Sequence, residues 1–183
     1  MNYKTLTVPD YKEISNEVYQ FIVDKTKILD QEEFWNISNL KSFCENNPKI
    51  INYFNSLGLT LINATVIHIT GKRTTEVHID GALDTVNPLR IQWGICNYEN
   101  TRTALYEFKN PNIKPIQRYT NDVNKSPFLY IIPSNVIEID SFVLDNGPVV
   151  WKPSMPHKVI TGNVFPRLTL TCSFAEPLDF LLE

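Results

Sequence analysis

A histidine and an aspartate, two residue types that bind metal ions, stand two positions apart at His78 and Asp80. On an extended chain successive side chains alternate, so residues i and i+2 point to the same side. This imidazole and this carboxylate would therefore face one point in space. A second imidazole from elsewhere would complete three ligands on one face of a metal ion and leave other coordination positions open.

The rest of the chain offers few candidates for the third ligand, because it contains only three histidines. We expect His157 to be the partner, because a jelly roll, the fold favoured below, brings early and late strands together. His68 is interpreted as a packed or hydrogen-bonded side chain rather than a ligand. Arg167 lies ten residues after His157, and Thr169 is two further on.

Each of these residues also has a plainer interpretation. His78 and Asp80 could be a solvated pair in a loop, and Arg167 could be a surface residue. Arg167 lies on a strand with a strongly alternating pattern, which argues against a surface position for this residue.

The elements that must position these residues fall into two parts. In the first part, helical periodicity with start and end signals predicts helices over residues 11–25, 38–44 and 48–57. From Leu59 the period changes to two, and strands are predicted over 59–70, 89–98, 103–108, 128–132, 136–144, 149–151, 157–161 and 167–174. This order predicts a mainly β fold with N-terminal helices, a double-stranded β-helix (a cupin-like jelly roll) backed by helices.

We expect the 183 residues to form a single domain, 1–183. Residues 1–58 would be a helical N-terminal support, 59–175 the double-stranded β-helix core, and 176–183 a docking tail. The polar, proline-containing stretch 110–127 is predicted to be a long loop. Its basic residues either only solubilise it or form a lid over the barrel mouth, to which residues 81–87 would also contribute.

The strand over 167–174 has two distinct faces, which gives an independent check on Arg167. One face holds Arg167, Thr169, Thr171 and Ser173, and the other holds Leu168, Leu170, Cys172 and Phe174. The polar face should line the barrel interior, and the apolar face should pack on the N-terminal helices. The same alternation in the strand from Leu89 turns Gln92 inward, whereas Asn97 falls on the other face unless a bulge intervenes.

The ordered set His78-x-Asp80, His157 and Arg167-x-Thr169 resembles the pattern of the Fe(II)/2-oxoglutarate-dependent oxygenases of the double-stranded β-helix fold. The resemblance covers roughly residues 59–175. It implies that His78, Asp80 and His157 are the catalytic ligands of Fe(II). It also implies that Arg167 anchors the distal carboxylate of the co-substrate 2-oxoglutarate, with help from Thr169.

Gln92, if it points inward, could also touch 2-oxoglutarate. The resemblance further implies a dioxygenase that uses O2 and releases succinate and CO2. It would oxidise, most simply hydroxylate, a C–H bond of an unidentified small molecule or protein side chain.

Two other functions fit the same fold. A cupin-like metal-dependent enzyme that is not an oxygenase would keep His78, Asp80 and His157 but have no need of Arg167. A jelly-roll binding module would need none of these residues, because a fold does not fix a function.

Composition excludes some partners. The formal net charge of −3 argues against a general nucleic-acid binder, and duplex nucleic acid is an unlikely partner. The three cysteines are far apart and odd in number, so they predict no disulfide framework and favour a reducing compartment. No apolar run reaches the length of a membrane span, so we expect a cytoplasmic protein without a membrane partner.

Overall fold

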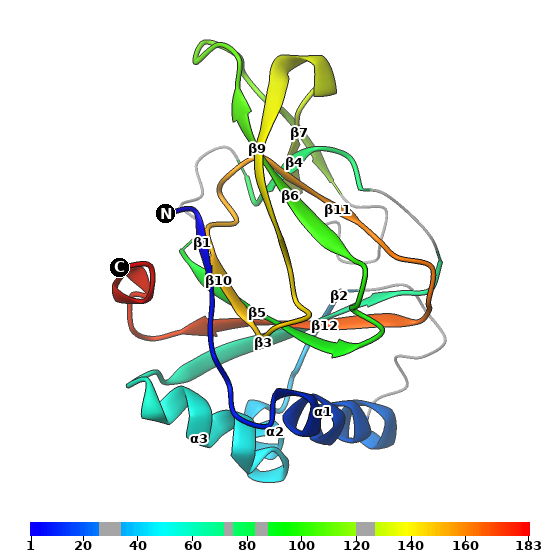
Figure 1. Cartoon of the computed structure of the whole chain (residues 1–183), viewed down its shortest axis with the longest axis vertical. Helices are drawn as coiled ribbons and strands as arrows, with labels where there is room; N and C mark the ends of the chain where they lie inside the picture. Colours follow the sequence, from blue (N-terminus) through cyan, green and yellow to red (C-terminus); the bar gives the residue numbers. More distant parts are fainter. Residues whose placement is uncertain (26–33, 72–74, 83–87, 120–126) are drawn as a thin grey trace.

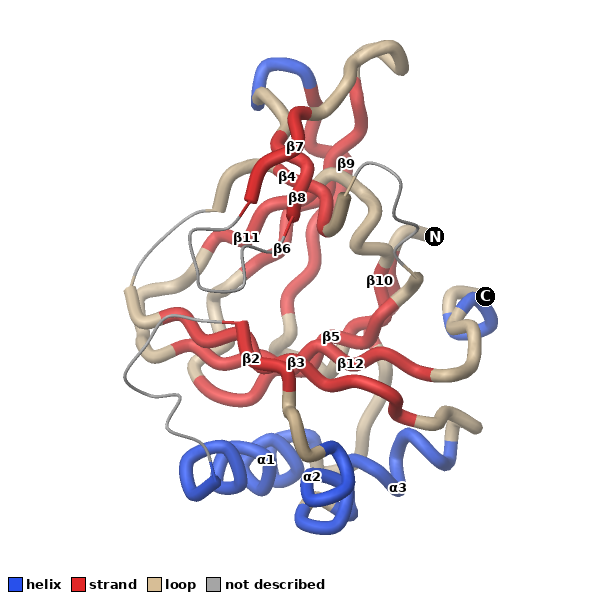
Figure 2. The backbone as a smooth tube through the Cα atoms, turned by 180° about the vertical axis from the view of Figure 1, so that it is seen from behind, coloured by secondary structure: helices blue, strands red, loops and turns tan. Residues whose placement is uncertain are grey.

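A computed structural model describes residues 1–25, 34–71, 75–82, 88–119 and 127–183 of the chain. Within these ranges, two six-stranded antiparallel sheets face each other, and helices cover the outer face of one sheet (Figures 1 and 2). The mainly β fold with N-terminal helices that the sequence predicts is confirmed.

The two sheets are built from strands that wind between them. The first sheet has the order β1-β10-β5-β12-β3-β2, with β1 (Tyr3–Thr5), β2 (Phe34–Asn36), β3 (Leu61–Ile69), β5 (Arg90–Cys96), β10 (Val149–Trp151) and β12 (Arg167–Phe174). The second has the order β7-β8-β4-β11-β6-β9, with β4 (His78–Asp80), β6 (Arg102–Phe108), β7 (Ile116–Tyr119), β8 (Pro127–Tyr130), β9 (Val136–Val143) and β11 (His157–Ile160). From β3 to β6, and again from β10 to β12, successive strands alternate between the sheets. This is the winding of a double-stranded β-helix.

The helices α1 (Tyr11–Lys25), α2 (Leu40–Asn46) and α3 (Pro48–Ser56) lie on the outer side of the first sheet (Figure 1). The α2 helix begins two residues later than predicted, because Asn39 rather than Ser38 caps it by accepting a hydrogen bond from the Ser42 amide at 2.9 Å. Short 3-10 turns occur at η2 (Pro133–Asn135) and η3 (Asp179–Leu181). None of the helices in the described ranges is long and apolar enough to cross a membrane.

The main hydrophobic core lies between the first sheet and the helices. The outward face of β12 contributes its whole predicted apolar set, Leu168, Leu170, Cys172 and Phe174. Helix α1 is fixed to the middle of β5, because the Tyr11 hydroxyl accepts a hydrogen bond from the Gly94 amide at 2.8 Å. Ser15, one turn on, accepts a hydrogen bond from the Trp93 indole at 3.0 Å. These contacts hold β5, which supplies one wall of the space between the sheets.

Strands β1, β2 and β7 were not predicted. The stretch predicted as a loop over 110–127 contains β7, which pairs with β8 along four residues. Residues 83–87 and 120–126 lie outside the described residues, so the predicted mouth and lid stay predictions. In the C-terminal stretch, Leu178 and Leu181 are buried in the core.

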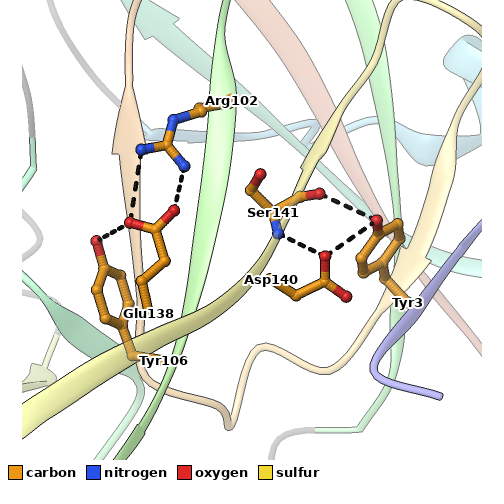
Figure 3. A network of polar contacts seen from close by, with 6 residues as sticks. All are labelled: Tyr3, Arg102, Tyr106, Glu138, Asp140 and Ser141. Carbon is orange, nitrogen blue, oxygen red and sulfur yellow. Dashed lines mark hydrogen bonds and ion pairs between the residues drawn. The ribbon is translucent and has the colours of Figure 1, made fainter.

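A polar network on the surface ties β9 to β6 and to β1 (Figure 3). Arg102 of β6 forms an ion pair with Glu138 of β9, which also accepts a hydrogen bond from the Tyr106 hydroxyl at 3.2 Å. Tyr3 of β1 donates a hydrogen bond to the Ser141 carbonyl of β9 at 3.0 Å. Because Tyr3 belongs to the first sheet and Ser141 to the second, the network joins the two sheets.

Candidate metal centre

His78, Asp80 and His157 meet in the space between the sheets. Strand β4 carries the first two, and β11 pairs with β4 in the register that places His157 opposite His78. The Nε2 atoms of His78 and His157 lie 3.5 and 3.7 Å from the same oxygen of Asp80, Oδ1. One potential ligand atom from each residue lies within 4.8 Å of the others, so the group could hold a metal ion.

Backbone carbonyls hold both imidazoles in the form that a metal requires. Nδ1 of His78 lies 2.8 Å from the carbonyl oxygen of Glu76, and Nδ1 of His157 lies 2.9 Å from that of Met155. A carbonyl can only accept a hydrogen bond, so each Nδ1 carries the proton and each Nε2 presents a lone pair. Such contacts fix the tautomer and the ring orientation of histidine ligands.

The electrostatics of the three residues also suit metal binding. Burial lowers the pKa of His157 to about 4, so this imidazole is neutral near pH 7. Burial raises the pKa of Asp80, but the hydrogen bond with His78 and nearby positive charges outweigh burial and lower it to about 2. Burial lowers the pKa of His78, but Asp80 and Glu76 together raise it by more, so its net shift is upward. A metal ion would displace the proton from His78 and take its place beside the carboxylate.

A cavity of about 110 Å³ adjoins the triad, and Arg167 lines it from the start of β12. The residue is only 2% exposed, and its Nε has no hydrogen-bond partner among the described residues. Burial lowers the pKa of Arg167 to about 10, so the side chain is still a cation at neutral pH. An unpaired buried charge is costly for a fold, and an anionic ligand would remove that cost.

Two more buried polar atoms on the same walls lack partners in the described part of the chain: Thr169 Oγ1 and Gln92 Oε1. Gln92 lines the cavity opposite Thr171 of β12, so it points inward. Thr169 is fully buried on the Arg167 face of β12 but is not among the residues that line the cavity. Asn97 does not reach the cavity, since its Nδ2 donates a hydrogen bond to the Pro166 carbonyl at 2.7 Å.

His68, the third histidine, lies away from the triad. Its neighbours Ile67 and Ile69 line the cavity, so His68 is on the opposite face of β3, where it is buried. This is the position expected of a packed histidine.

Among the cavity residues to which sequence reasoning gave no role are Arg90 and Trp151. Arg90 begins β5 and shares a face with Gln92, so the alternation that turned Gln92 inward was also a signal for Arg90. Trp151 is the last residue of β10. Its ring also meets that of His157 edge-on, with centroids 4.7 Å apart.

No protein-family model matches this chain, and no curated protein matches its sequence. Its structure is similar to the crystal structure of a Pseudomonas putida prolyl-4-hydroxylase, with 10% identity and a TM-score of 0.44, over 94% of this chain and 91% of that chain. At this TM-score the similarity carries no argument about activity. The resemblance seen in the sequence is upheld in one respect, because His78, Asp80 and His157 form one cluster.

Proposed function

We propose that the protein is an Fe(II)- and 2-oxoglutarate-dependent dioxygenase that hydroxylates a C–H bond of an organic substrate. The observation that carries this proposal is the presence, in one cavity, of a His–Asp–His triad and the buried guanidinium of Arg167, whose Nε has no partner among the described residues. The triad alone would suit several metalloenzymes. The additional buried cation calls for an anionic co-substrate.

The residues of the site fit both groups. Two imidazoles and one carboxylate on one face suit Fe(II) and leave positions for the co-substrate and O2. When bound, Fe(II) and 2-oxoglutarate supply the oxidising chemistry, with succinate and CO2 as products. Arg167 would grip the distal carboxylate of 2-oxoglutarate with its planar fork.

The unpartnered atoms of Thr169 and Gln92 support the same role. Leaving a buried polar group without a hydrogen bond costs roughly 1–3 kcal/mol, which a hydrogen-bonding ligand would recover. The Thr169 hydroxyl can donate to a carboxylate, and the Gln92 amide can turn to do the same. Ile67, Ile69 and Val159 also line the cavity and restrict water there, which strengthens the attraction between Arg167 and an anion.

The test measures binding before turnover. Without O2, the protein should bind Fe(II) or Mn(II) and then 2-oxoglutarate, and admitting O2 to the Fe(II) form should yield succinate. Asp80→Ala should lose the metal, whereas Arg167→Ala should keep the metal and lose 2-oxoglutarate. Arg102→Ala, on the outer surface, is the matched control and should keep both. Wild-type protein that binds neither, or Asp80→Ala protein that still binds both, would refute the proposal.

The triad by itself favours a second candidate, a cupin-like metal-dependent enzyme that is not an oxygenase. Two histidines and a carboxylate are also a ligand set of catalytic zinc. In that case the protein would bind a metal but no 2-oxoglutarate, and Arg167→Ala would not change its metal affinity. A jelly-roll binding module would bind neither.

A further inference from the structure

The proposed function leaves one cation of the cavity unused. Arg90 lines the same cavity as the triad, and its Nε is buried without a hydrogen-bond partner in the described part of the chain. His78, Asp80 and His157 line this cavity as well. Arg90 therefore faces the triad without a carboxylate of its own among the residues described.

Arg90 lies at the end of the cavity where the triad is. It pairs with Trp151 across the ladder between β5 and β10, and the ring of Trp151 contacts that of His157. The buried Nε1 of Trp151 also has no hydrogen-bond partner among the described residues. A guanidinium and a neutral N–H donor thus lie next to each other beside the metal site.

Arg167 is anchored at a different point along the sheet from Arg90. It begins β12, whereas Cys172, five residues later, pairs with Ile91, the neighbour of Arg90. Five residues of extended strand span about 16 Å. In the proposed complex, 2-oxoglutarate has one carboxylate on the metal and the other on Arg167. It then has no anionic group left for Arg90.

We propose that Arg90 binds a carboxylate of the primary substrate, a small carboxylic acid, and so holds one of its C–H bonds beside the metal. This inference rests on the proposed function, which assigns Arg167 to the co-substrate. The planar fork of a single arginine matches a carboxylate in shape, and its one charge balances one negative charge. A phosphate carries more negative charge, and Asp80 would repel it more strongly.

The test uses the full chain loaded with Mn(II) and 2-oxoglutarate without O2, so that binding is measured and not turnover. The probes are the free L-amino acids and their α-amides, capped tripeptides with a central Asp or Glu and their Asn or Gln counterparts, and inorganic phosphate. Calorimetry and the thermal unfolding midpoint report binding. We expect at least one carboxylate probe to bind, and its amide counterpart to bind about 10-fold more weakly or worse.

Arg90→Met should weaken binding of that probe by about 10- to 100-fold, and Arg90→Lys should restore part of it. Both variants should bind Mn(II) and 2-oxoglutarate as the wild type does, which also shows that they are folded. Arg102→Met, which removes an arginine from the outer surface, should change none of these affinities. Binding of free amino acids alone identifies a free acid as the source of the carboxylate, whereas binding of the acidic tripeptides identifies a peptide side chain and overturns the free-acid assignment.

Four results would overturn the inference: no carboxylate probe binds, phosphate binds more tightly than every carboxylate, Arg90→Met binds the probe as the wild type does, or Arg90→Met loses 2-oxoglutarate itself. In the last case Arg90 would be holding the co-substrate. Wild-type protein that takes up no Mn(II) or 2-oxoglutarate would instead refute the proposed function at the earlier loading step, and this inference with it.

Discussion

Arginine side chains differ in their pairing between two regions of the molecule. The regions are the outer surface of β6 and β9 and the cavity between the sheets. The Arg102 side chain is 40% exposed and still has Glu138 as its ion-pair partner (Figure 3). Arg167 is 2% exposed, and its Nε has no partner in the described ranges. If stability alone decided, the buried arginine would be paired before the exposed one, because an unpaired charge is costly where water is excluded. The 2-oxoglutarate of the proposed function would supply this missing partner.

Hydroxyl groups show the same contrast. The exposed Thr60 donates a hydrogen bond to Glu176 at 2.8 Å. The fully buried Thr169 has no partner for its Oγ1 among the described residues. Of these two threonine hydroxyls, the one that water could have served has a partner and the one that water cannot reach has none among the described residues. This is the pattern expected of a ligand site.

The largest expected effect is a difference in metal affinity between variants of two aspartates, one in the cavity and one on the outer surface. Asp80→Asn removes the only anionic ligand of the triad, so metal affinity should fall by more than about 100-fold, beyond the usual effect of changes around the ligands. Asp140→Asn alters only the surface network, in which Asp140 accepts a hydrogen bond from the Tyr3 hydroxyl, and should leave metal affinity unchanged. Mn(II) titration by calorimetry measures both. Similar losses in the two variants would remove the distinction between the regions.

The next effect is a difference between variants of the two arginines in how they change the stability of the ligand-free protein. Arg167→Met removes a buried charge and keeps an unbranched stem, so the ligand-free protein should be as stable as the wild type or up to about 4 kcal/mol more stable. Its 2-oxoglutarate affinity should fall by about 100-fold, since a bidentate charged contact is lost. Arg102→Met should cost less than about 1 kcal/mol and keep the affinity.

Urea unfolding with and without Mn(II) and 2-oxoglutarate tests this pair of variants. A larger loss of ligand-free stability in Arg167→Met than in Arg102→Met would show that the buried guanidinium has a partner within the protein.

A smaller effect separates the two threonines. Thr169→Val should leave the stability of the ligand-free protein nearly unchanged, because no hydrogen bond to the described residues is lost. It should weaken 2-oxoglutarate binding by about 3- to 10-fold, the value of one hydrogen bond. Thr60→Val should instead lower the unfolding free energy by about 0.5–1.5 kcal/mol and leave binding alone. Equal losses of stability in both would contradict the contrast.

The smallest effect is the pH dependence of the surface pair. The hydrogen bond from Arg102 lowers the pKa of Glu138 below its usual 4.5. A carboxyl whose folded pKa is lowered contributes stability that is present above the unfolded pKa and is lost as pH falls through the folded value. The stability gap between wild type and Glu138→Gln should therefore be constant above about pH 5 and close at lower pH.

Because Glu138 is exposed and screened by solvent, that gap should stay below about 1 kcal/mol and shrink further in high salt. Urea midpoints measured from neutral pH down to about pH 3 would show it. A gap that widens on acidification would mean that the ion pair does not favour the charged carboxylate.

The sequence predicted β12 well and three short strands not at all. Its strict alternation over 167–174 defined both faces, and the structure puts Arg167 toward the cavity and Leu168 in the core. Strand β1 gains its pairing only from Val149–Trp151, far along the chain, so no local signal marks it. The same holds for β2, which pairs with β3. Edge strands of three or four residues depend on such partners more than on their own propensity.

The site divides in the same way. Histidine and aspartate two positions apart are conspicuous, so the triad could be predicted before its geometry was known. Arg90 and Trp151 are ordinary residues for a strand, and only their place beside His157 and Asp80 makes them candidates for a role in the site. Spatial proximity of this kind arises from pairing across sheets, which a single sequence does not reveal.

The position of β12 has a consequence for how the protein is made. It is the last strand in chain order, yet it lies inside the first sheet between β5 and β3. During synthesis from the N-terminus, the edges of β3 and β5 that pair with β12 therefore stay unpaired until residue 174 has left the ribosome. Exposed edges of this kind favour aggregation, and pairing between distant segments is slow. We therefore expect the cavity to form only after β12 has been made, with a nascent chain that benefits from chaperones until then.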